Sequence, residues 1–196
     1  MFELPIYEAL ITDEIDGITA VSLVDAPAVE SDFLKFNKEK EKMLFSIDNE
    51  EKRIVTGVVL RADFPIYRIT NSGYEYYIVF SQDTIIKMTE KMLKQNTFNN
   101  INLEHNDNRF VEGVTLRELF IKDTEKGINP KEFEDISNGS LFATYHIENN
   151  EVWEQIKQGT FNGFSIECYV DVEEVKEEPK EIDTIEELLD YINNYK

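Results

Sequence analysis

Residues 161–175 read FNGFSIECYVDVEEV, and their regular alternation of apolar and polar side chains decides the fold. Such alternation predicts a β-strand with one face against a core and the other face free for a different role. The apolar face carries Phe164, Ile166, Cys168, Val170 and Val172. The polar face carries Ser165, Glu167, Tyr169, Asp171 and Glu173. We therefore expect Ser165 to point away from the main core.

The segments before this strand predict an α+β domain that is mainly β. NNEVWEQIKQG (149–159) predicts a helix over 150–158, capped by an Asn and stopped by Gly159. SQDTIIKMTEKMLKQ (81–95) predicts a second helix, with Ser81 as its N-cap and apolar residues at helical spacing. A polar stretch, 122–139, is typical of a loop. Apolar, often β-branched runs predict strands within 53–63, 64–70, 74–80, 101–106, 110–121 and 141–148.

The two ends of the chain differ in composition from this domain, which we place at 53–175. We expect residues 1–52 to form an N-terminal extension, because Pro27 interrupts regular structure there and the mixed-charge run 37–52 is typical of a solvated helix or linker. Residues 176–196 form an acidic tail. Apolar residues at helical spacing predict an amphipathic helix over about 183–193 in this tail.

Composition excludes several classes of function. The 196 residues carry a formal net charge of −20, which argues against nucleic acid and against an anionic membrane surface as partners. No stretch approaches the ~18 apolar residues of a membrane-spanning helix, and the N-terminus lacks the basic start of a signal peptide. The single cysteine, Cys168, excludes an internal disulfide. We expect a soluble protein of a reducing compartment.

Ser165 and His105 are the main candidates for chemistry. In INLEHN (101–106), strand alternation places His105 on the apolar face with Ile101 and Leu103. Such a histidine is either a core residue with a satisfied hydrogen bond or a partly buried general base. Ser165 is either an ordinary polar-face serine or a nucleophile. The surrounding GFSIE is not a G-x-S-x-G nucleophile elbow, which disfavours an α/β-hydrolase.

The remaining reactive side chains are weaker candidates. Cys168 lies on the apolar face, where a small buried hydrophobe is expected. His146 shares a strand face with Thr144 and Glu148 and is a solvated histidine by default, although it could assist His105. Two histidines forty-one residues apart do not predict a metal site. Scattered glycines predict no phosphate loop, so we expect neither metal nor cofactor.

Three segments carry a resemblance to a known family. VSLVDAPAVESDFLKF (21–36), LEHN (103–106) and EVWEQIKQGTFNGFSIE (151–167) resemble the XkdF-like prohead serine proteases of tailed phages. These enzymes look like distant relatives of herpesvirus assemblin. The resemblance implies an assemblin-like β-barrel or half-barrel with flanking helices, and by analogy a homodimer. It also implies a serine endopeptidase with Ser165 as nucleophile and His105 as general base.

The resemblance leaves the third catalytic residue open. Assemblin-like enzymes use a second histidine after the serine, and no histidine follows Ser165 here. Glu167 is a candidate, but it stands two positions along the same strand, about 6.6 Å away, which suits a neighbour better than a residue that orients His105. His146, Asp171 and Glu173 are further candidates.

The function implied by the resemblance is maturation of the phage head. The substrates would be the scaffold protein, the major capsid protein and the protease itself, inside a prohead in the bacterial cytoplasm. An alternative is a catalytically idle relative that serves as scaffold or internal head protein, and a third is an acidic binding module of cellular origin. The first two differ in whether Ser165 Oγ and the His105 ring come within about 2.6–3.2 Å of each other.

Overall fold

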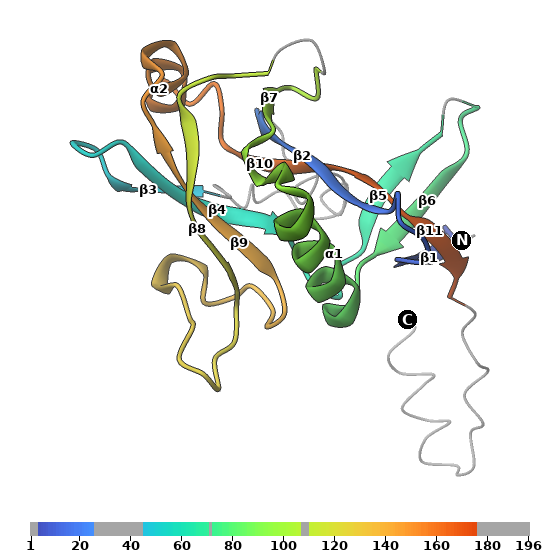
Figure 1. Ribbon diagram of the computed structural model, residues 1–196. Helices are drawn as coiled ribbons and strands as arrows, with labels where there is room; N and C mark the ends of the chain where they lie inside the picture. Colours follow the sequence, from blue (N-terminus) through green and yellow to red (C-terminus); the bar gives the residue numbers. More distant parts are fainter. Residues whose placement is uncertain (1–3, 26–44, 71, 107–109, 176–196) are drawn as a thin grey trace, which may run out of the picture.

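The computed structural model describes residues 4–25, 45–70, 72–106 and 110–175 (Figure 1). The described chain is mainly β, with two α-helices and two short 3-10 turns. No helix in these ranges is long and apolar enough to span a membrane. In chain order the elements are β1 (Ile6–Leu10), β2 (Gly17–Val24), β3 (Phe45–Asn49), β4 (Ile54–Leu60), β5 (Ile66–Ile69), β6 (Glu75–Val79), α1 (Gln82–Gln95), η2 (Thr97–Asn99), β7 (Ile101–Leu103), β8 (Val114–Ile121), η3 (Lys131–Phe133), β9 (Leu141–Ile147), α2 (Asn150–Lys157), β10 (Gly163–Tyr169) and β11 (Asp171–Glu174).

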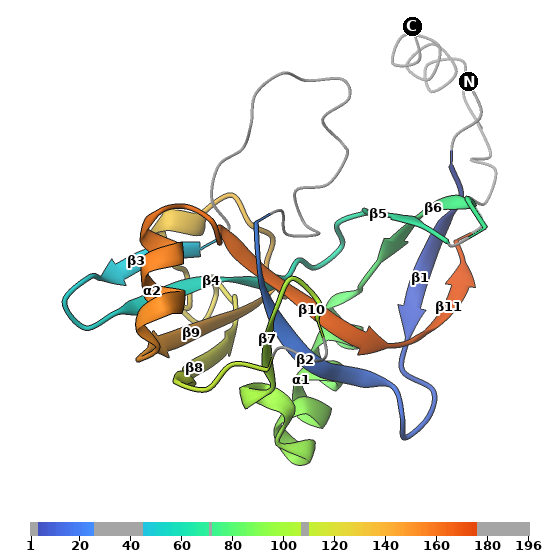
Figure 2. The same cartoon turned by 90° about the horizontal axis from the view of Figure 1, so that it is seen from above.

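The strands form three hydrogen-bonded sheets, with the orders β11-β1-β6-β5, β10-β2-β7 and β3-β4-β9-β8. In Figure 2, β10 crosses above β4 and leads into β11, so that it links the sheets at the two ends of the molecule. This arrangement confirms the mainly-β α+β class. Within the described ranges the three sheets do not join into a closed barrel. The likeness to assemblin therefore stays a prediction.

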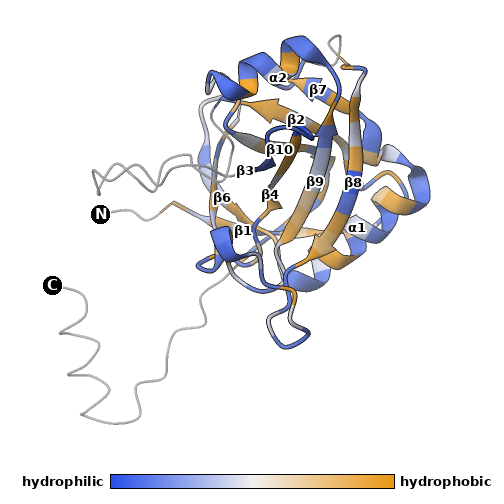
Figure 3. Ribbon diagram, turned by 90° about the vertical axis from the view of Figure 1, so that its left-hand side faces the viewer, coloured by the Kyte–Doolittle hydropathy of each residue, from blue (hydrophilic) through white to orange (hydrophobic). Residues whose placement is uncertain are grey.

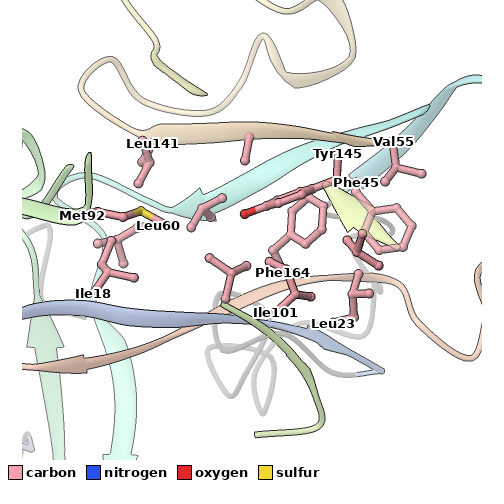
Figure 4. Packing of buried hydrophobic residues seen from close by; sticks show 14 of the residues in the cluster. Ile18, Leu23, Phe45, Val55, Leu60, Met92, Ile101, Leu141, Tyr145 and Phe164 are labelled. Atoms are coloured by element: carbon pink, nitrogen blue, oxygen red, sulfur yellow. The ribbon is translucent and has the colours of Figure 1, made fainter. Parts of the chain in front are cut away.

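The main core lies between β2 and β10 on one side and β4 and β9 on the other (Figure 4). The ring centroid of Phe164 lies 5.2 Å from that of Tyr145 and 5.4 Å from that of Phe45. Figure 3 shows hydrophobic residues in orange along the strands around this core, with blue on much of the loops. Because successive side chains of a strand alternate, Ser165 projects to the face of β10 opposite to Phe164.

Both predicted helices are confirmed, with the expected caps. The Ser81 side chain accepts a hydrogen bond from Thr84 N at the start of α1, and Asn149 accepts one from Val152 N at the start of α2. Gly159, just beyond α2, has a φ of +73°, the left-handed conformation that ends many helices. The predicted strands are also found, except in the segment around His105.

Two predictions about the N-terminal segment are wrong. Residues 1–52 were expected to form an extension, but β1 and β2 are core strands, and β2 is the central strand between β10 and β7. The physical reason is that GITAVSLV is buried along nearly its whole length, as a strand between two others requires. Within 37–52, where a solvated helix or linker was expected, β3 instead pairs with β4. The segment 26–44 and the tail 176–196 with its predicted helix lie outside the described residues.

Candidate active site

Three neighbouring strands place a row of polar side chains on one face of the β10-β2-β7 sheet. Ser165 of β10 is in register with Ser22 of β2, and Ser22 is in register with Asn102 of β7. Residues paired in this way share a sheet face. Their exposed fractions are 4%, 0% and 0%, so the row is buried. A buried row of polar groups needs internal hydrogen bonds to be stable.

His105 reaches this row from a turn and not from a strand. The prediction of a strand over 101–106, with His105 on its apolar face, is wrong beyond Leu103. Glu104 and His105 have φ values of +53° and +54°, and Asn106 N donates to Leu103 O at 3.1 Å, which closes the turn. Two consecutive non-glycine residues in the left-handed region are strained, and such strain is concentrated at functional sites.

The strained turn is fixed by contacts to the end of β2. Glu104 N donates to Leu23 O at 3.0 Å, and Glu104 Oε1 accepts from Asp25 N at 2.8 Å. These bonds fold the chain back so that His105 lies over the polar row. The His105 side chain keeps 44% of its surface exposed. The ring is therefore anchored at one end of the row and open to solvent, and to a substrate, at the other.

Four side chains, including that of His105, form one cluster in which Ser22 and Glu167 contact the His105 ring and Asn102 joins these two. Nδ1 of His105 lies 3.1 Å from Ser22 Oγ and 3.5 Å from Glu167 Oε1. Asn102 Nδ2 donates to Glu167 Oε1 at 2.5 Å. Ser22 Oγ donates to Asn102 Oδ1 at 2.6 Å and lies 3.4 Å from Glu167 Oε1. We call Ser22, Asn102, His105 and Glu167 the histidine cluster.

The geometry of the cluster favours Glu167 among the candidates for the third catalytic residue. Sequence spacing favoured a mere neighbour of Ser165, yet the turn at 104–105 brings His105 Nδ1 beside the Glu167 carboxylate. A carboxylate beside Nδ1 accepts a hydrogen bond from its proton and orients the ring, which is the third residue's part in a serine hydrolase triad. With Nδ1 turned towards Ser22 and Glu167, Nε2 is the ring nitrogen left for another partner.

Ser165 stands next to the cluster with its hydroxyl uncommitted. It pairs across strands with Ser22 and shares the polar face of β10 with Glu167. No hydrogen bond of its Oγ is found among the described residues, to His105 or to any other group. A free hydroxyl, a histidine and a carboxylate on one sheet face are the side chains that acyl transfer through a serine requires.

The sequence comparison assigns the chain to a family with this chemistry. Residues 41–174 match the family described as "Putative phage serine protease XkdF", and the chain belongs to this family. The resemblance found in the sequence is thus confirmed. No curated protein and no solved structure matches the chain. The matched segment includes Ser165, His105 and Glu167, whereas Ser22 lies before it.

The other candidates lie apart from the histidine cluster. His146 of β9 is in register with Ile54 and Thr115 and lines a hollow with Arg117 and Glu148. Asp171 accepts a hydrogen bond from Thr12 Oγ1. Glu173 stands opposite Glu8 at the β1-β11 pair. Burial raises the pKa of the Cys168 thiol to about 11, although the Arg68 charge opposes that shift. Within the described ranges, no hydrogen bond or ion pair of these side chains reaches the cluster.

Sequence reasoning missed Ser22 and Asn102. A serine inside an otherwise apolar run, GITAVSLV, was the available signal for Ser22. Asn102 had no comparable signal, because a polar residue on the outer face of a strand is ordinary. Among the described residues, no group of three His, Cys, Asp or Glu side chains is placed to hold a metal ion.

Proposed function

We propose that this chain is a prohead maturation protease that cleaves the scaffold protein, the major capsid protein and itself during phage head assembly. In this proposal Ser165 is the nucleophile, His105 the general base and Glu167 the carboxylate that orients His105. One observation carries the assignment: Nδ1 of His105 faces Glu167 and Ser22, while Ser165, the adjacent serine on the same face, has a free hydroxyl.

The proposed reaction uses these residues in two acyl transfers. Nε2 of His105 takes the proton from Ser165 Oγ as that oxygen attacks the carbonyl carbon of the scissile peptide bond. Backbone N–H groups stabilise the resulting oxyanion, and Gly163 lets the substrate backbone approach closely. His105 then gives its proton to the leaving amine, and an activated water releases the acyl group as a carboxylic acid. Glu167 stabilises the imidazolium formed in each half of the reaction.

The proposal requires His105 and Ser165 to come together when a substrate binds. No hydrogen bond joins them in the described structure, and catalytic hydrogen bonds are often long before the substrate is bound. The ring is exposed and carried on a strained turn, and it already contacts Ser22, the residue that pairs with Ser165 across the row. We place this step in the prohead interior, within the host cytoplasm, where substrate chains are concentrated. A homodimer is expected from the assemblin analogy.

The same missing hydrogen bond would also suit a catalytically idle relative that acts as scaffold or internal head protein. The two functions separate in one experiment: intact mass after co-expression with the capsid and scaffold proteins. Wild type is compared with Ser165→Ala, and with Ser72→Ala as a control at an exposed serine. The protease predicts processed masses in wild type and Ser72→Ala that are absent in Ser165→Ala. Unprocessed masses in all three, with proheads assembled, would establish the structural function instead.

A further inference from the structure

The hydrogen bonds of the histidine cluster have a fixed direction, which starts at Glu167. An ionised carboxylate only accepts hydrogen bonds, so the Asn102 amide must turn its NH₂ group towards Glu167 Oε1, at 2.5 Å. The amide oxygen of Asn102 then faces Ser22 Oγ at 2.6 Å. Because an amide oxygen accepts only, the single hydroxyl proton of Ser22 points at Asn102.

The direction of these bonds determines which ring nitrogen of His105 carries the proton. With its own proton committed to Asn102, Ser22 Oγ presents a lone pair to His105 Nδ1 at 3.1 Å. The second group near Nδ1, Glu167 Oε1 at 3.5 Å, is also an acceptor. Nδ1 must therefore be the protonated nitrogen of the neutral ring, which leaves the lone pair on Nε2. In the opposite tautomer, Ser22 would turn its proton to Nδ1, and two acceptor oxygens would then face each other at 2.6 Å.

We propose that Ser22 and Asn102 are positioning residues that hold His105 in the Nδ1–H tautomer, with Nε2 free to act as the base. This inference rests on the proposed function, in which Nε2 is the atom that accepts the Ser165 proton. Ser22 is the informative member because it lies before the segment that matches the family, on a strand that the composition assigned to an extension. The site thus depends on β2 as well as on β7 and β10.

The charged groups around the ring agree with this assignment. Glu167, from β10, is the one carboxylate that contacts the ring within the described residues. Glu104 precedes His105 in the turn, but its Oε1 accepts from Asp25 N at 2.8 Å, at the end of β2. Ser22 of β2 supplies the neutral contact to the ring, and Asn102 of β7 contacts Ser22 and Glu167. All three strands of the sheet therefore contribute residues that keep the proton on Nδ1 of His105.

Nitrogen-15 NMR of the imidazole ring tests the inference without any need for cleavage. The full chain carrying Ser165→Ala, which would not process itself, is observed at a pH where His105 is neutral. We expect His105 to show a protonated Nδ1 and an unprotonated Nε2. Ser22→Ala or Asn102→Leu in the same background should shift the ring towards the Nε2–H tautomer, and Ser22→Thr, which keeps the hydroxyl, should restore the Nδ1–H form.

The matched control is Thr144→Val, which removes a buried hydroxyl bonded to Thr56 within the β3-β4-β9-β8 sheet, a different sheet from that of the cluster. It should leave the His105 signals unchanged. In the cleavage-competent chain we expect Ser22→Ala to lower kcat/KM about 10- to 100-fold and to change its pH profile, because general base catalysis as a whole contributes about 10²–10⁴-fold. Thr144→Val should leave both readouts near wild type.

Two results would overturn the inference. One is an Nε2–H tautomer in the Ser165→Ala chain, a measurement that needs no further substitution and is immune to misfolding of a variant. The other is an unchanged tautomer in a folded Ser22→Ala chain. Failure of the proposed function would look different, because wild type would then leave its substrates unprocessed, or processing would persist in Ser165→Ala, whatever the state of the His105 ring.

Discussion

Two buried polar centres of this molecule are built in contrasting ways. Lys122, 2% exposed, directs Nζ at the carbonyl oxygens of Phe133, Glu134 and Ile136, at 2.8, 2.9 and 2.6 Å. An ammonium group has three protons, so this centre is complete within the protein. The histidine cluster begins as deeply, at Ser22 and Asn102, but ends on a ring that is 44% exposed.

The difference separates a polar centre that stabilises from one that reacts. Around Lys122, each proton is bound, and the three carbonyls belong to η3 and the chain just after it. The lysine thereby closes the long loop that follows β8 onto its own start. Around His105, the contacts fix Nδ1 and leave Nε2 without a partner in the cluster. A ring nitrogen that has no partner in the cluster is available to a substrate, and it costs little stability because the ring is partly exposed.

His105→Ala should have the largest effect, because it should abolish processing while stability stays unchanged. We expect processing in the co-expression assay to fall by at least about 10³-fold, because a catalytic residue that acts as part of a unit removes most of the acceleration when it is lost. Removal of a half-exposed ring from a strained turn should leave the denaturant midpoint of unfolding nearly unchanged. Intact mass and urea unfolding check the two halves. A variant that unfolds at a lower urea concentration than wild type, yet still processes its substrates, would show that His105 stabilises the fold and does not catalyse.

Lys122→Met should give the opposite outcome, with lost stability. The substitution keeps the length of the side chain but removes a donor from three carbonyl oxygens, of which Phe133 O keeps its bond from Ile136 N, and we expect a cost of roughly 3 kcal/mol in the free energy of unfolding. Urea denaturation measures it. Lys126→Met is the matched control, because that exposed lysine pairs with Asp123 at the surface, where removal should leave the midpoint unchanged. Equal stability of the two variants would contradict the structural assignment of Lys122.

Glu167→Gln tests the carboxylate of the cluster with a side chain of nearly the same shape. The substitution removes a negative charge 3.5 Å from Nδ1 and replaces an acceptor-only group with one that can also donate. We expect kcat/KM to fall about 10- to 100-fold, within the range that general acid–base catalysis supplies, and stability to change little. Glu173→Gln, on exposed β11, is the control. A similar loss in both variants would remove Glu167 from the mechanism.

The contrast also shows which parts of the site could be predicted from the sequence. Ser165 was placed on the correct face of β10, because strand alternation is a local rule that holds between Phe164 and Glu167. Further along, the predicted strand divides into β10 and β11, and Val172, expected on the core face, is exposed. His105 was misplaced, because its position depends on a left-handed turn at Glu104 and His105, and the two residue types did not indicate such a turn. Ser22 was missed because the burial of β2 comes from pairing with β7 and β10, which are distant in sequence.

The smallest expected effect concerns Cys168, whose thiol we compare with the Ser165 hydroxyl on the same strand. It lies three residues beyond Ser165 and takes part in the core packing, and burial raises the pKa of its thiol to about 11. The folded chain therefore keeps the proton to higher pH than the unfolded chain, where a thiol has a pKa of about 8.5. This preference contributes stability below about pH 8.5 and is lost as pH rises towards 11.

Alkylation by iodoacetamide, followed by intact mass, checks this prediction. At pH 8 the folded chain should react much more slowly than the chain in urea, and its rate should climb as the pH approaches about 11. Cys168→Ser should abolish the added mass. Rapid labelling of the folded chain at pH 8 would place a reactive thiolate on β10 and make Cys168 a rival nucleophile. Slow labelling leaves Ser165, on the polar face of the same strand and in register with Ser22 of the histidine cluster, as the candidate nucleophile.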